Sequence, residues 1–112
     1  IGVVTAPGDR YDDKLREIGR ICGKGFDYLI VRQMTDLRGR PLGEAPELIM
    51  EGVREVGLAP EMTVLVLDEP EAIRKAIEMG RDGDLIIIGC SDTADMIADV
   101  TKHAEILIPT VE

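Results

Sequence analysis

Residues 1–31 read IGVVTAPGDRYDDKLREIGRICGKGFDYLIV, and their pattern predicts the first three elements of the fold. It begins and ends with short, continuous apolar runs, residues 1–6 and 26–31, which contain β-branched side chains and are bounded by Gly, Pro or Asp. Such runs are typical of strands that are buried on both faces of a sheet. Between the two runs, Leu15, Ile18 and Cys22 recur at helical spacing. The stretch therefore predicts a strand, a helix and a second strand.

The same alternation continues along the rest of the chain. Apolar runs at residues 63–68 and 84–89 predict two more strands. Before each of these strands, apolar residues at helical spacing predict a helix, which ends at Gly57 in one case and at Gly80 in the other. A fourth helix is expected at residues 92–102. Strands that alternate with helices in this way predict an α/β fold, a mostly parallel sheet with helices on both faces.

Right-handed crossovers favour the strand order 4-1-2-3 for such a sheet. In this order the first and fourth strands are neighbours, and the direction of winding reverses between them. Ligands of open α/β sheets bind at this reversal, beside the carboxyl ends of the strands. The segments at residues 6–13 and 89–93 are therefore expected to flank a binding crevice. The outer edge of the fourth strand would be covered by residues 105–109, as a short last strand, or by a second copy of the chain.

Length, charge and composition exclude several classes of protein. The chain has 112 residues, enough for one domain, and its 22 acidic against 13 basic side chains argue against a nucleic-acid binder. No apolar run is long enough to span a membrane, and no signal peptide is expected. One histidine and two distant cysteines cannot build a zinc site, and the cysteine content favours a cytoplasmic protein. Because Ile1 already lies within a predicted strand, we expect a fragment of a longer chain.

The first candidate site is the turn Gly8-Asp9-Arg10 after the first strand. Gly8 permits a tight turn, and Asp9 either caps the following helix or serves a binding site. A cation near a helix N-terminus opposes the helix dipole, so Arg10 is expected to meet a bound anion there. The alternative is that Arg10 pairs with Asp12 or Asp13.

The second candidate is the loop at residues 32–43, which follows the second strand and opens on the same edge of the sheet. It gathers Arg32, Asp36, Arg38 and Arg40 in a strongly acidic protein. Guanidinium groups in this setting suit a carboxylate or a phosphate. The alternative is a solvated loop whose arginines pair with acidic side chains of the same segment, Asp36 and Glu44.

The third candidate segment follows the fourth strand and contains Gly89, Ser91 and Asp92. Gly89 permits a close approach of the backbone, and either Ser91 or Asp92 could cap the next helix. The chain contains no phosphate-binding loop and no dinucleotide-binding glycine motif. On these grounds the chain alone does not look like a complete enzyme, and no metal site is predicted.

Three blocks together resemble the Mur ligase family: GVVTAPGDRYDDKLREIGRI at 2–21, FDYLIVRQMTDLRGR at 26–40 and EAIRKAIEMGRDGDLIIIG at 71–89. The likeness is to the C-terminal domain of these ATP-dependent ligases, and within the family to the cyanophycin synthetase branch. It implies a Rossmann-like domain that closes over a central ATPase domain. It also implies ATP and Mg²⁺ in the intact parent enzyme, with an amino acid and a carboxylate or peptide-like molecule as substrates.

The resemblance also assigns roles to individual residues. It implies that Arg10 helps to hold the incoming amino acid, together with Asp36 and Arg38, and that Arg40 is a further candidate. The Asp-Asn-Pro-Arg run of many family members is replaced here by Asp-Leu-Arg-Gly-Arg at 36–40. The Gly-Lys-Gly-His-Glu run of several peptidoglycan ligases is replaced by Gly-Cys-Ser-Asp-Thr at 89–93. Two other hypotheses remain open, namely a non-catalytic module that binds an anion or nucleotide, and a dimerisation module.

Overall fold

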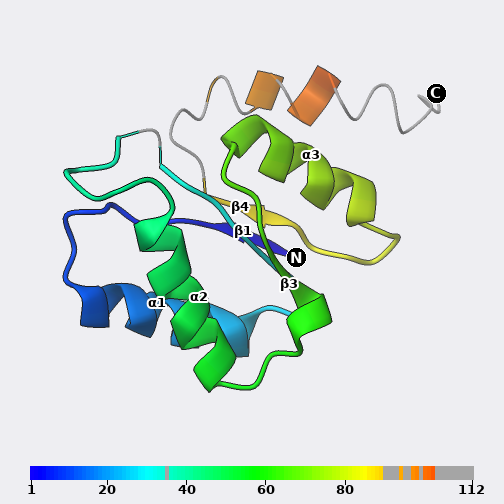
Figure 1. Cartoon of the computed structure of the whole chain (residues 1–112). Helices are drawn as coiled ribbons and strands as arrows, with labels where there is room; N and C mark the ends of the chain where they lie inside the picture. The colour runs from blue at the N-terminus through cyan, green and yellow to red at the C-terminus, as the bar shows by residue number, and fades with distance from the viewer. Residues whose placement is uncertain (35, 90–93, 95–96, 99, 103–112) are drawn as a thin grey trace.

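The computed structural model describes residues 1–34, 36–89, 94, 97–98 and 100–102 (Figure 1). Its four strands form one parallel sheet in the order β3-β2-β1-β4. This is the predicted order 4-1-2-3 seen from the opposite edge, so the predicted fold class is confirmed. The strands are β1 (Gly2–Val4), β2 (Leu29–Val31), β3 (Thr63–Leu65) and β4 (Ile87–Ile88).

Three helices and a short 3-10 helix connect the strands. They are α1 (Asp12–Gly25), α2 (Glu44–Glu55), the 3-10 helix (Pro60–Met62) and α3 (Glu69–Met79). Figure 1 shows α1 and α2 together on one face of the sheet and α3 on the other, which gives the three layers. None of the described helices is long and apolar enough to cross a membrane.

The predicted fourth helix and last strand fall mostly outside the described residues. Within 92–102, the described positions 94, 97–98 and 100–102 are helical. The predicted strand at 105–109 lies wholly outside the described residues, so the covering of the β4 edge stays a prediction.

Successive side chains of the central strands enter two separate cores. Leu29 and Val31 pack in the core beneath α1 and α2, whereas Val3 and Ile30 pack in the core beneath α3. All four side chains are fully buried. Because both faces of the sheet are covered, these strands need apolar residues at every position, which explains the continuous apolar runs.

Glycines allow α1 and α2 to touch backbone to backbone. A Cβ atom on Gly19 would collide with the carbonyl oxygen of Ile49, and a Cβ atom on Gly52 would collide with that of Arg16. Ion pairs of 2.8 and 2.9 Å flank this contact, from Arg16 to Glu51 and from Arg20 to Glu55. The close packing fixes how the first turns of both helices lie beside the carboxyl edge of the sheet.

Candidate functional site

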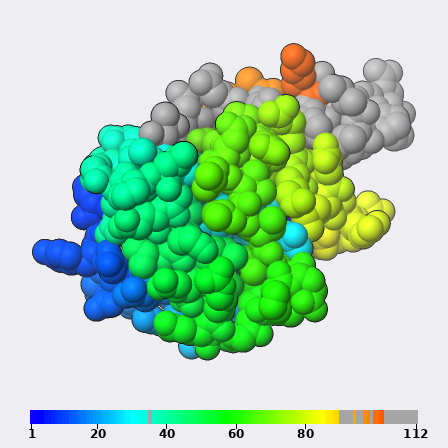
Figure 2. Space-filling model, in the orientation of Figure 1, coloured from blue at the N-terminus to red at the C-terminus, as the bar shows by residue number. Residues whose placement is uncertain are grey.

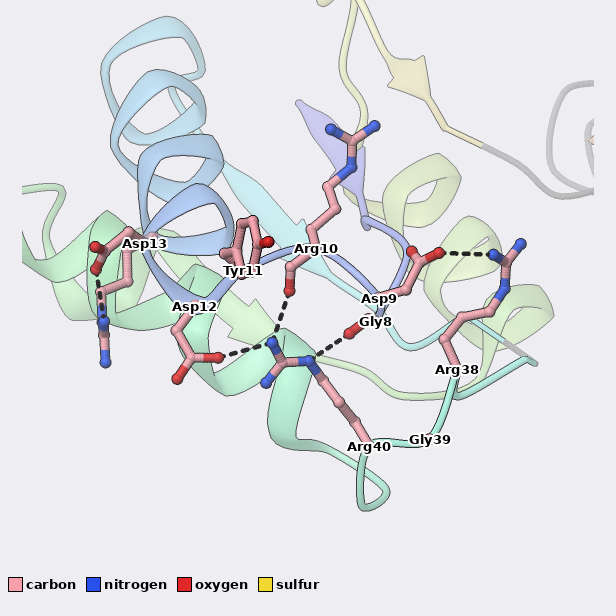
Figure 3. A pocket seen from close by; sticks show the side chains of 10 residues that line it. Gly8, Asp9, Arg10, Tyr11, Asp12, Asp13, Arg38, Gly39 and Arg40 are labelled. Atoms are coloured by element: carbon pink, nitrogen blue, oxygen red, sulfur yellow. Dashed lines mark hydrogen bonds and ion pairs between the residues drawn. The ribbon is translucent and has the colours of Figure 1, made fainter.

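The loops that follow β1 and β2 lie side by side at the carboxyl edge of the sheet (Figures 1 and 2). They touch at Gly8, where a Cβ atom would lie 2.5 Å from the carbonyl oxygen of Leu37, so the approach requires glycine. An open hollow of about 660 Å³ lies over this junction. It is lined by Gly8, Asp9, Arg10, Tyr11, Asp12, Asp13, Arg16, Arg38, Gly39 and Arg40 (Figure 3).

Arg10 is the least constrained cation of the hollow. Its side chain is exposed and points away from the guanidinium group of Arg40 (Figure 3). The alternative pairing with Asp12 or Asp13 is wrong for this structure, because Asp12 binds Arg40 and Asp13 binds Arg16. No described residue forms an ion pair with Arg10, so the five N–H donors of its guanidinium group can face a ligand.

Arg38 is held by two carboxylates but keeps part of its hydrogen-bonding capacity. Its Nη1 lies 3.0 Å from Asp9, and its Nε lies 2.9 Å from Asp36. The other oxygen of Asp36 accepts the backbone N–H of Arg38, which adopts a left-handed conformation with φ of 51°. Three guanidinium N–H groups of Arg38 remain available, since the two pairs use only two of the five.

Two sequence-based alternatives are settled by these contacts. The pairing of Arg38 with Asp36 within the loop is confirmed. Capping of α1 by Asp9 is wrong, because the N-cap is Tyr11 and no side chain caps that end of the helix. The physical reason is position: α1 begins at Asp12, so Asp9 lies two residues before the N-cap, and its carboxylate pairs with Arg38 instead.

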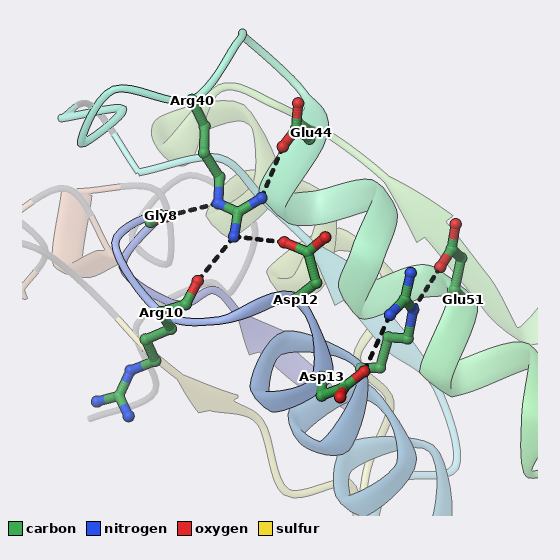
Figure 4. A network of polar contacts seen from close by, with 8 residues as sticks. Gly8, Arg10, Asp12, Asp13, Arg40, Glu44 and Glu51 are labelled. Carbon is green, nitrogen blue, oxygen red and sulfur yellow. Dashed lines mark hydrogen bonds and ion pairs between the residues drawn. The ribbon is translucent and has the colours of Figure 1, made fainter.

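Arg40 connects the two loops (Figure 4). Its Nη1 lies 2.6 Å from the carboxylate of Glu44, and its Nη2 lies 2.7 Å from that of Asp12. Its Nη2 also donates to the carbonyl oxygen of Arg10 at 2.7 Å, and its Nε donates to the carbonyl oxygen of Gly8. The hydrogen bond to Asp12 raises the pKa of Arg40, as does the one to Glu44, although desolvation partly opposes them. The predicted pairing with Glu44 is therefore confirmed.

Arg32 lies beneath the strand ends and not at the surface of the hollow, since only 1% of its side chain is exposed. Its Nε and Nη2 both donate to the carbonyl oxygen of Gly89, at 3.2 and 3.0 Å. Its Nη1 forms a 3.2 Å ion pair with Glu69, at the start of α3. Arg32 thus joins the ends of β2 and β4 to α3, across the point where the winding reverses.

Three contacts of this region were not predicted from the sequence. Asp12 holds Arg40, Glu69 holds Arg32, and the buried Gln33 accepts the backbone N–H of Gly43 through its side-chain oxygen. No local spacing indicates these contacts, because the partners lie ten or more residues apart in the chain. The predicted Ser91 and Asp92 lie outside the described residues.

The described residues bring two arginines to one hollow but bring no group of metal ligands together. No three His, Cys, Asp or Glu side chains of the described part come together as a metal ion would require. Arg10 and Arg38 border one hollow from different loops, and both retain N–H donors. Guanidinium groups in such a setting bind carboxylates or phosphates through paired hydrogen bonds.

Comparisons with known proteins show two groups of relatives of this chain. The chain is 42% identical over 89 residues to cyanophycin synthetase of Nostoc sp. (strain PCC 7120 / SAG 25.82 / UTEX 2576). The matched residues cover 79% of this chain and 10% of that protein. It is 33% identical over 104 residues to cyanophycin synthetase of Geminocystis herdmanii (strain PCC 6308), covering 92% of this chain and 12% of that protein. No family model matches the chain.

A second group of relatives carries a different name. The chain is 33% identical over 81 residues to UDP-N-acetylmuramoyl-L-alanyl-D-glutamate--2,6-diaminopimelate ligase of Chlorobaculum tepidum (strain ATCC 49652 / DSM 12025 / NBRC 103806 / TLS), covering 72% of this chain and 15% of that protein. The chain thus spans about a tenth to a sixth of the length of these curated relatives. The three sequence blocks, the parallel sheet and these relatives lead to one assignment: this chain is a domain of the Mur ligase family.

Proposed function

We propose that this chain is the C-terminal domain of a longer, ATP-dependent ligase and holds the incoming amino acid by its carboxylate. The observation that carries the proposal is Arg10, an exposed cation with no ion-pair partner among the described residues. It lies at the winding reversal of a parallel sheet, where ligands of such sheets bind. Arg38 borders the same hollow, and its remaining N–H groups would contact the same carboxylate or a neighbouring anion.

The parent enzyme would join this amino acid to a second substrate, a carboxylate or peptide-like molecule. ATP with Mg²⁺ would activate that carboxylate in a central ATPase domain. Arg10 and Arg38 would orient the amino acid so that its amine faces the activated carboxylate. Asp9 and Asp36 would support Arg38, and closure of this domain over the central domain would exclude water. We place the enzyme in the cytoplasm.

Replacement of Arg10 tests the proposal. In the full-length ligase that carries this domain, Arg10→Ala is expected to raise the KM for the amino acid about 30-fold to 100-fold. The reason is the loss of charge-assisted hydrogen bonds to a carboxylate. The KM for ATP should stay within about twofold, because ATP would bind in another domain. The measurement is steady-state kinetics with each substrate varied in turn.

Arg74→Ala is the matched control, since it removes an exposed arginine from α3, on the opposite face of the sheet. We expect unchanged kinetics for Arg74→Ala. For Arg10→Ala and Arg74→Ala alike, the free energy of unfolding should stay within about 1 kcal/mol of that of the unsubstituted protein. A normal KM for the amino acid in Arg10→Ala would refute the proposal.

Two other outcomes would favour the alternative functions. Tight binding of an anion or nucleotide by the isolated chain, without ligase activity in the parent enzyme, would favour a non-catalytic binding module. A mass that doubles with concentration, without ligand binding, would favour the dimerisation module.

A further inference from the structure

Arg40 uses almost its whole hydrogen-bonding capacity inside the protein. Four of its five guanidinium N–H donors are engaged, one by Gly8, one by Glu44, and two by Arg10 and Asp12. Only 16% of the side chain is exposed. Arg40 therefore has little left to offer a ligand, although it borders the same hollow as Arg10.

The acceptors of Arg40 lie around the residue that the proposed function requires. Two of them are the carbonyl oxygens of Gly8 and Arg10, which flank Asp9 in the turn. Within this turn the backbone N–H of Arg10 bonds to the carbonyl oxygen of Pro7 over a long 3.3 Å. The strong contacts that fix the backbone of Arg10 therefore come from Arg40.

The charges around Arg40 show why an arginine is needed. Asp12 and Glu44 lie in the first turns of α1 and α2, where acidic side chains suit the helix dipoles. Arg40 bridges these two carboxylates at 2.7 and 2.6 Å, and without it they would repel one another. A lysine would neutralise the charge, but a single ammonium group has three donors and no planar fork to reach four separate acceptors.

We propose that Arg40 is a positioning residue: it clamps the Gly8–Arg10 turn to the start of α2 and so fixes the backbone from which the side chain of Arg10 extends at the border of the hollow. This inference rests on the proposed function of Arg10. It assigns Arg38 as the arginine of the second loop that contacts the amino acid, and Arg40 as the residue that acts through the placement of Arg10.

A double-mutant cycle in the full-length ligase tests this role. Arg40→Met is expected to raise the amino-acid KM about tenfold, with kcat and the KM for ATP within about twofold. In the Arg10→Ala background, the same substitution should raise the amino-acid KM by less than about twofold, because Arg40 acts through Arg10. If the two effects multiply, Arg40 contacts the substrate itself and the inference is wrong. If Arg10→Ala alone has no effect, the proposed function fails instead.

Amide NMR spectra of the 112-residue chain provide a readout that does not depend on ligase activity. Arg40→Met should shift the amide signals of residues 8–12 and leave those of α3 unchanged. Arg54→Met is the control, because it removes a 59% exposed arginine of α2 that pairs with Glu47. Arg40→Lys keeps the positive charge and replaces Arg40→Met in these experiments if the methionine variant does not fold. We expect it to raise the KM for the amino acid about threefold. Unchanged signals at 8–12 or an unchanged KM would each overturn the inference.

Discussion

Gly19→Ala is expected to lower the free energy of unfolding by about 3 kcal/mol or more, and the melting temperature by at least about 10 °C. In an isolated helix the same substitution would stabilise by about 1 kcal/mol, since alanine is the better helix former. Here the new Cβ atom would meet the backbone carbonyl of Ile49, which cannot rotate away as a side chain would. Relief requires α1 and α2 to separate, which opens the core between them.

Gly52→Ala should cause a loss of similar size, because its Cβ atom would meet the carbonyl oxygen of Arg16 in the reciprocal contact. Gly25→Ala is the matched control at the end of the same helix α1, where a Cβ atom would find no heavy atom within 4 Å. Its free energy of unfolding should stay within about 1 kcal/mol of the parent. The measurement is chemical denaturation of all three variants. Equal stability of the Gly19 and Gly25 variants would contradict the close helix contact.

Arg32→Met is expected to lower the free energy of unfolding by about 3–5 kcal/mol, the range for removing one partner of a buried ion pair. The substitution leaves the carboxylate of Glu69, which is 18% exposed, without the guanidinium group beside it. It also removes both donors that Arg32 supplies to the carbonyl oxygen of Gly89. The end of β4 would then lose its attachment to the end of β2.

A second substitution distinguishes the ion pair from simple loss of volume. Glu69→Leu in the Arg32→Met background removes the carboxylate that pairs with Arg32, so the double variant should be more stable than Arg32→Met alone. Chemical denaturation of the single and double variants measures this difference. If Arg32→Met lowers the free energy of unfolding by less than about 1 kcal/mol, the contacts of Arg32 do not stabilise the fold appreciably. Its sequence-based role as a substrate contact would then become the stronger hypothesis.

Local patterns were sufficient to predict the order of strands and helices. The apolar runs around Val3 and Ile30 mark strands that are buried on both faces, and the spacing of Leu15 and Ile18 marks a helix. These patterns depend on neighbours within a few residues, and right-handed crossovers then leave few topologies. The same reasoning located the candidate site at the carboxyl edge, because in a parallel sheet every strand ends on that side.

The partners that lie far away in the sequence could not be predicted, although those within the second loop were. Arg38 lies 29 residues from Asp9, and Arg40 lies 28 residues from Asp12, yet both pairs form where two loops meet. Arg32 similarly reaches Gly89 across 57 residues. Each of these arginines has acidic residues near it in the sequence as well, so local spacing offers several equivalent partners.

Periodicity and chain direction were sufficient to predict the layers, the strand order and the edge of the sheet where the candidate site lies. The tertiary structure was needed to show that Arg38 and Arg40 are held by carboxylates and that Arg10 has no ion-pair partner among the described residues. The reason is that hydrogen-bonding capacity depends on where distant carbonyl and carboxylate oxygens come together. The glycine contact of α1 with α2 sets the positions of Asp12 and Glu44, and these carboxylates hold Arg40, so Asp12 is not available to pair with Arg10.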